Sequence, residues 1–236
     1  MKRFVLLLLL GAVVGAAARA QNVVTDVLAG KLVKPKVGQW AWYDLLDNRG
    51  ARLYTFRHAV VGKERVGRKT GWWIEFELVP DVGYTSVYKM LLTGPATEPK
   101  NIEKVLLKDG PEPVQDVTPT AQPPDDDGDD EEKKSEAVTR ESLGEEDVTT
   151  PAGVIRAERF VVTKGEREFE VWIDEKVRPT GIVRMVSPDG QLVLRSHGLG
   201  GENGESALDA RVRRRKRPEV EVLKSPAPKD AEGGDE

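Results

Sequence analysis

The stretch WWIEFELV, residues 72–79, alternates between two sets of side chains. Residues 72, 74, 76 and 78 are all apolar, whereas two of the residues between them, Glu75 and Glu77, are acidic. A period of two is typical of a β-strand that buries one face. This stretch therefore predicts a sheet protein with an apolar inner face and a largely polar outer face.

The same alternation extends outward along the chain in both directions. Turn sequences such as Lys164-Gly165 and Ser187–Gly190 separate consecutive segments, and residues 62–71 are expected to bridge to the next strand as a long hairpin. Consecutive strands joined by short turns favour an antiparallel meander. Besides 72–79, strands are predicted at 40–45, 54–60, 85–92, 102–107, 154–163, 166–174, 181–187 and 191–196. The predicted fold class is mainly β.

A single short helix is predicted near the N-terminus, at Val23–Val33. Val24, Val27 and Leu28 share one face of such a helix. Gly30 and Pro35 are typical of its C-terminal end.

Residues 1–20 have the pattern of a cleavable secretion signal. Lys2 and Arg3 precede an apolar run, and Ala18-Arg19-Ala20 is an A-x-A cleavage site at Ala18 and Ala20. The apolar run of about 14 residues is shorter than the ~20 that span a bilayer. The chain has no cysteine for lipid attachment or disulfides. We expect a soluble, exported protein, periplasmic or extracellular, with no transmembrane anchor after signal cleavage.

Composition divides the mature chain into four parts. A β domain is predicted in two parts, 21–117 and 147–198, separated by a Pro-rich acidic insert at 118–146 and followed by a tail at 199–236. The insert contains DDDGDDEE (Asp125–Glu132), and the tail contains RVRRRKR (Arg211–Arg217). Such segments bury too little apolar surface to offset the entropy of ordering, so both are predicted to be disordered.

The residues that usually carry catalysis are scarce. The chain has two histidines, His58 and His197, with no zinc-ligand spacing. We interpret His58 as a hydrogen-bonded strand residue and His197 as exposed. The Gly-rich HGLGGENG, residues 197–204, lacks the third glycine of a phosphate loop and is interpreted as a flexible exit from the last strand. No catalytic residue, metal or cofactor is predicted.

A hydrolase is the weakest function considered. Its candidate acids are Glu75, Glu77, Glu168 and Glu170, which occupy outward strand positions and are expected to be solvated.

The two charged runs permit further interpretations. Asp125, Asp127 and Asp129 have the alternate spacing of a calcium loop, but Asp130 stands where the turn needs glycine. A solvated spacer and weak calcium binding are both left open. The basic run could contact envelope polyanions or pair with the acidic insert, and nucleic acid is not expected for an exported protein. The polyanion candidates are Arg211, Arg213, Arg214, Arg215, Lys216 and Arg217.

Two stretches, Gly38–Leu78 and Glu146–Gly198, carry a family resemblance. They contain a G-x-W-x-x-Y opening at Gly38, a V-x-x-P-A-G turn at Val148 and a W-I-x-x-x-V-x-P-x-G-I-V hairpin at Trp172. These motifs resemble the periplasmic half-barrel proteins related to the LolA/LolB lipoprotein carriers. The resemblance implies a strongly curved antiparallel sheet that wraps a helix or an apolar groove.

The resemblance also implies a binding function. In such proteins the groove can hold acyl chains, so a lipid or a lipoprotein is the expected partner. The alternative is an envelope interaction or scaffold protein that acts through its acidic insert and basic tail. Whether the groove is open or filled by the N-terminal helix stays open. The residues expected to line it are Trp40, Trp42, Tyr54, Phe56, Trp72, Ile74 and Phe76.

Overall fold

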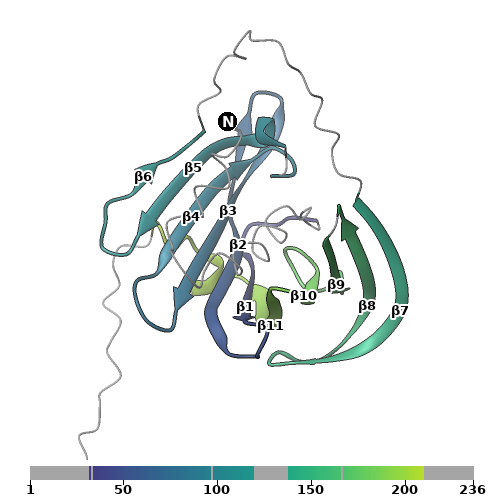
Figure 1. The fold of residues 1–236 in the computed structure, drawn as a ribbon. Coiled ribbons are helices and arrows are strands. Elements are labelled where there is room, and N and C mark those ends of the chain that lie inside the picture. The colour runs from purple at the N-terminus through teal and green to yellow at the C-terminus, as the bar shows by residue number, and fades with distance from the viewer. Residues whose placement is uncertain (1–31, 33, 97, 120–137, 166, 210–236) are drawn as a thin grey trace, which may run out of the picture.

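The computed structural model describes residues 32, 34–96, 98–119, 138–165 and 167–209, which form a single antiparallel sheet (Figure 1). Its strands are β1 Gln39–Leu46, β2 Arg52–Val66, β3 Lys69–Pro80, β4 Ser86–Leu92, β5 Ile102–Asp109, β6 Gln115–Asp116, β7 Val138–Thr150, β8 Gly153–Lys164, β9 Arg167–Ile173, β10 Ile182–Ser187 and β11 Gly190–Leu199. Two 3₁₀ turns, η1 Pro99–Asn101 and η2 Glu202–Gly204, accompany them.

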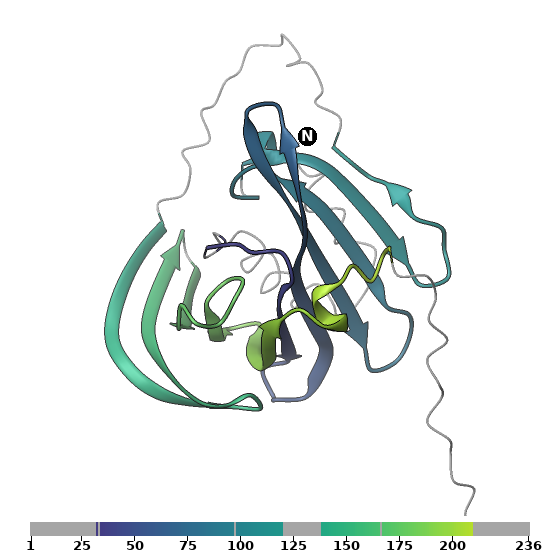
Figure 2. The same cartoon turned by 180° about the vertical axis from the view of Figure 1, so that it is seen from behind.

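The sheet consists of two meanders joined side by side. Its strand order is β6-β5-β4-β3-β2-β1-β11-β10-β9-β8-β7, so the first strand pairs with the last. The register of this pair runs from Gln39 opposite Leu199 to Leu46 opposite Gln191. The edge strands β6 and β7 do not pair with each other. Figures 1 and 2 show the two halves curving toward each other, which confirms the predicted curved antiparallel sheet.

The core lies on the inner side of this curve. Tyr43, Phe56 and Phe76 form an aromatic row, with ring centroids 6.2 Å apart for the first pair and 5.7 Å for the second. Leu192 and Leu194 of β11 belong to the same buried cluster. The Tyr43 hydroxyl lies 3.2 Å from Thr180 Oγ1 and donates to the Ile182 carbonyl at 3.1 Å. Side chains from both meanders therefore share one core.

The structure corrects the predicted insert. Residues 138–146, assigned to a disordered segment, belong to β7, which pairs with β8 along its length. Residues 139–147 of this edge strand are exposed on both faces, so they lack the apolar alternation that reveals a half-buried strand. Backbone pairing with β8 holds this strand, and exposed ion pairs such as Arg156 with Glu145 and Asp147 lie on its surface. The remaining insert residues with the acidic run, 120–137, lie outside the described residues.

The long hairpin predicted at 62–71 is confirmed, and most of its residues belong to the two strands themselves. β2 continues to Val66 and β3 begins at Lys69, so the turn is confined to Gly67 and Arg68. Gly67 has a φ of +57°, which a tight hairpin turn requires and glycine adopts without strain. Because Lys63 and Glu64 are polar, apolar alternation did not indicate that β2 continues to Val66.

Several predicted segments cannot be compared with the structure. The signal with Ala18 and Ala20, the helix at 23–33 apart from Leu32, and the basic run at 211–217 lie outside the described residues. Within the part of the chain that is described, no helix has the length and apolar character needed to cross a membrane.

Candidate functional site

The inner face of β2 and β3 carries five of the seven predicted groove residues. Tyr43 lies opposite Phe56, and Val60 lies opposite Ile74, so these core residues share one face of the sheet. Phe56 is packed inside the aromatic row, and Tyr54 lies against the same cluster. Trp72, Ile74 and Phe76 instead border a cavity.

Trp40 and Trp42 lie on the opposite, outer face, which corrects the prediction for these two residues. Trp42 lies opposite Arg57, one position out of phase with Tyr43 and Phe56. The Trp40 Nε1–H donates to the Gly200 carbonyl at 2.9 Å, and the Trp42 Nε1–H donates to Asn203 Oδ1 at 3.0 Å. Because both phases of WAWYDLL carry large apolar side chains, with Asp44 in the same phase as the two tryptophans, alternation alone left the inward phase undecided.

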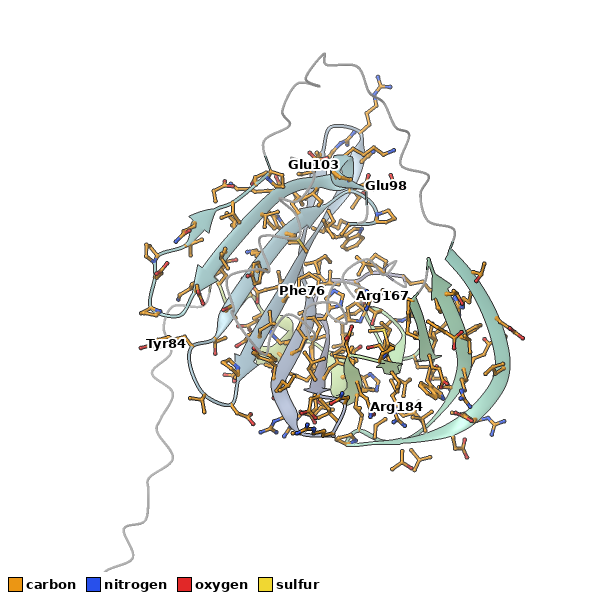
Figure 3. The ribbon with its side chains drawn as sticks, viewed as in Figure 1. Phe76, Tyr84, Glu98, Glu103, Arg167 and Arg184 are labelled. Carbon is orange, nitrogen blue, oxygen red and sulfur yellow. The ribbon has the colours of Figure 1, made fainter. Side chains whose placement is uncertain are left out.

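The cavity has a volume of about 190 Å³ and lies at the end of β2 and β3 nearest the η1 turn. Hydrocarbon side chains make up much of its wall, and Thr70 and Thr93 contribute hydroxyls. Figure 3 places Phe76 in the interior of the curved sheet. The cavity is lined by Leu32, Pro35, His58, Thr70, Trp72, Ile74, Phe76, Leu92, Thr93, Gly94, Pro95 and Ala96.

His58 is the one titratable side chain in the lining of this cavity. It is buried, and its ring stacks on Phe76 at a centroid distance of 4.5 Å. Burial lowers the pKa of His58 to about 3, and the positive charge of Arg57 adds to the effect. Neither ring nitrogen has a hydrogen-bond partner among the described residues. The predicted strand position of His58 is confirmed, whereas the expected hydrogen bond is not formed with any described residue.

The outer face of β2 and β3 is covered by the chain after the last strand. We call residues 200–209 the C-terminal strap. Beneath it, the buried Arg57 forms ion pairs with Glu75 and Glu77. Arg57 also donates to the carbonyls of Asn203, at 2.7 Å, and Glu205, at 3.1 Å. The strap therefore adds two acceptors to a buried cation.

Glu75 is bound by the strap in the same way. Its carboxylate accepts hydrogen bonds from Ser206 Oγ at 2.6 Å and from the Ala207 amide at 2.7 Å. A carboxylate removed from water needs such donors and a cation, and Glu75 has both. The expectation that Glu75 is solvated is wrong, because the strap covers an outer face that the sequence pattern leaves open.

The predicted flexible exit at 197–204 is also corrected. Gly200 and Gly201 have φ values of +74° and +66°, which turn the chain back onto the sheet. A Cβ atom at Gly204 would lie 2.6 Å from the Gly38 carbonyl oxygen, so only glycine permits this approach. The four glycines of HGLGGENG were visible in the sequence. They allow tight turns and close backbone packing, and were interpreted as a flexible exit.

Of the other hydrolase candidates, Glu77 meets Glu75 at their shared partner Arg57, whereas Glu168 and Glu170 lie on β9. Glu77 pairs with Arg57, Glu168 is exposed on β9, and Glu170 accepts from Arg159 at 2.8 Å. His197 is exposed, as predicted. Among the described residues, no group of three His, Asp or Glu side chains is placed to hold a metal ion.

Comparisons with known proteins find similar solved structures only. A candidate lipoprotein from Parabacteroides distasonis is 12% identical, with a TM-score of 0.37, covering 72% of this chain and 99% of its own. A candidate exported protein with a YmcC-like fold from Bacteroides fragilis is 13% identical, with a TM-score of 0.35 and the same coverage of 72% and 99%. No protein-family model and no curated protein matches. At these TM-scores no function follows for this chain, and a relation to the LolA/LolB carriers stays a prediction.

Proposed function

We propose that this chain is an exported, non-enzymatic protein of the cell envelope that binds a lipid or another apolar ligand. The observation that carries the proposal is the cavity on the inner face of β2 and β3, lined by Trp72, Ile74, Phe76 and Leu92. An apolar wall in a concave site is typical of small-molecule binding sites. The signal at residues 1–20 supports export.

The size of the cavity limits how much ligand it holds. Its volume of about 190 Å³ exceeds the ~150 Å³ of an apolar cavity that binds benzene. It is smaller than the ~300 Å³ at the low end of sites for drug-sized molecules. We expect it to enclose one apolar group or one segment of an acyl chain, with the rest of a larger ligand outside.

The chemistry of the buried polar groups supports a binding role over catalysis. A general base works best when its pKa lies near the operating pH, whereas the pKa of His58 is about 3. Glu75 is already engaged by Arg57, Ser206 and Ala207. Neither group is poised to transfer protons to a substrate.

Native mass spectrometry of protein purified from its own envelope without detergent tests the proposal. We expect a co-purifying apolar species on the wild-type protein. The species should be lost from Ala96→Phe, which places a ring in the cavity, and retained by Ala152→Phe, which places one in the exposed turn before β8. A wild-type protein that carries no ligand and binds no added lipid would overturn the proposal.

A further inference from the structure

Two turns at one end of the sheet carry exposed apolar side chains. We call these turns, residues 81–85 between β3 and β4 and residues 110–114 between β5 and β6, the tip. The exposed fraction is 91% for Val82, 72% for Tyr84 and 45% for Val114. Exposed apolar side chains that are grouped on one surface mark interaction sites, whereas those scattered singly do not.

The backbone holds the two turns of the tip side by side. The Gly110 amide donates to the Thr85 carbonyl at 3.0 Å. A Cβ atom at Gly110 would lie 2.7 Å from the Tyr84 Cβ, so Tyr84 packs directly against this glycine. Figure 3 shows Tyr84 at the periphery of the molecule, far from the core residue Phe76. The tip is therefore an apolar surface with a supported backbone.

Acidic side chains border the apolar ones. Asp81 pairs with Arg52 at 2.9 Å, and Asp109 accepts from Ser86 Oγ at 2.7 Å. Glu112 is exposed on the second turn. The tip by itself therefore has little attraction for an anionic surface, and such an attraction needs cations from another segment of the chain.

The C-terminal strap brings a basic segment to this end of the sheet. Its last residue, Asp209, pairs with Lys89 of β4, and Lys89 is at most about 18 Å along the chain from Tyr84. The basic run Arg211–Arg217 begins two residues after Asp209 and extends at most about 29 Å from it. The basic run is therefore within reach of the tip.

We propose that the tip and the basic run together dock this protein on a bilayer surface that contains anionic phospholipid. Val82 and Tyr84 enter the headgroup region, where tyrosine is enriched in membrane proteins. The basic run adds electrostatic attraction, since each Lys or Arg near an anionic membrane favours binding. A single weak anchor gives marginal binding, whereas an apolar anchor with a polybasic segment gives stable attachment.

This docking surface is separate from the cavity of the proposed function. The cavity lies beside Thr70 and Trp72 at the start of β3, whereas the tip follows Pro80 at its end. Ala96→Phe, which fills the cavity, should therefore leave membrane binding unchanged.

Vesicle flotation of the exported full-length protein tests the tip. We expect binding to phosphatidylcholine vesicles that contain phosphatidylglycerol, weaker binding as salt is raised, and little binding to phosphatidylcholine alone. The double variant Val82→Ser/Tyr84→Ser should bind about tenfold more weakly, the effect of one apolar side chain kept in water. The matched control is Leu143→Ser/Val154→Ser, which changes two exposed apolar residues of the other half and should keep the wild-type affinity.

Truncation tests the basic run. A chain ending at Asp209 keeps the strap but lacks every basic residue of the run, so it should bind the anionic vesicles at least tenfold more weakly. A chain ending at Arg217 keeps the run and should bind as the full chain does.

A fluorescent label locates the membrane contact directly. The chain has no cysteine, so one introduced cysteine takes an environment-sensitive fluorophore at a single site. The emission of a label on Val82→Cys should shift to shorter wavelength when anionic vesicles are added, and that of a label on Val154→Cys should not.

Two results would overturn the inference. The first is wild-type affinity of the double tip variant together with an unshifted label at position 82, which would mean that the basic run alone holds the lipid. The second is no binding of the wild-type protein to the anionic vesicles. Neither result bears on the cavity, which the co-purifying ligand tests independently.

Discussion

At the scale of single residues, His58 shows how burial changes the pKa and the hydrogen bonding of a side chain. Its sequence neighbours Tyr54 and Phe56 correctly indicated an inner-face position, and the register places it opposite Phe76. What the sequence could not indicate is that no described residue pairs with its nitrogens. That property depends on every element that packs around the ring.

The lowered pKa of His58 predicts that acid destabilises the fold. The folded pKa is about 3, and the unfolded value is about 6.5, so between these values the unfolded chain binds a proton that the folded chain does not. The free energy of unfolding should fall by up to about 1.4 kcal/mol per pH unit as the pH drops below about 6.5. Urea unfolding at pH 7, 6 and 5 measures this slope.

The slope should be smaller in His58→Phe and unchanged in His197→Phe. Carboxylates contribute mainly below about pH 5, so the interval from pH 6.5 to 5 isolates the histidine. Equal slopes in the wild type and in His58→Phe would show that protonation of His58 does not oppose folding.

The buried pair of Arg57 and Glu75 predicts a large effect from a small change. Glu75→Gln keeps the shape of the side chain but removes its charge, leaving Arg57 with Glu77 as its one anionic partner among the described residues. Removing one member of a buried ion pair costs about 3 kcal/mol or more. Urea unfolding should show this loss in the free energy of unfolding.

Glu145→Gln is the matched control, because Glu145 forms an exposed pair with Arg156 at 3.4 Å. Exposed pairs contribute about 0–1 kcal/mol. Similar losses in the two variants would mean that the strap does not shield Glu75 from water.

At the scale of elements, the C-terminal strap completes the outer face. It contacts β1 through Trp40 and Trp42, β2 through Arg57, and β3 through Glu75. Without it, the ion pairs beneath would face water, and the strap hydrogen bonds to Glu75 and Arg57 would be lost.

Truncation tests this role of the strap. A chain ending at Gly201 should lose about 3 kcal/mol or more in free energy of unfolding, since it lacks the partners that Ser206 and Ala207 provide to Glu75. A chain ending at Asp209 keeps every strap contact described here and should match the full chain. Equal stability of the two truncated chains would contradict a structural role for the strap.

At the scale of the whole molecule, the pairing of β1 with β11 makes one unit from two meanders. The buried cluster contains residues of both halves, and Tyr43 of β1 bonds to Thr180, just before β10, and to Ile182, the first residue of β10. The first meander alone would leave apolar side chains of its inner face in water, because β9 to β11 supply the side chains that pack against them.

A shared core predicts a single cooperative unfolding transition. Trp40, Trp42, Trp72 and Trp73 belong to the first meander, so tryptophan fluorescence reports mainly on that half, whereas far-ultraviolet circular dichroism reports on every strand. The two signals should give the same denaturant midpoint. Separate midpoints would show that the halves unfold independently.

The sequence by itself determined most of the strands and the antiparallel pairing of consecutive ones. Alternation is a local property, because successive side chains of a strand point to opposite faces, and it revealed strands such as β3 and β4 without any knowledge of the fold. The turn sequences Lys164-Gly165 and Ser187–Gly190 likewise marked the ends of β8 and β10. Most of β7 was missed because its residues 139–147 are exposed on both faces and show no such alternation.

The tertiary structure alone decided the faces and the site. Whether Trp42 or Tyr43 points inward depends on which face the other half covers, and local alternation is the same in both cases. The strap reaches Arg57 across 148 positions from Glu205, and Tyr43 meets Thr180 across 137. Contacts over such separations leave no local pattern. The burial of Glu75, the covered outer face and the lack of a partner for His58 among the described residues therefore depend on the tertiary structure.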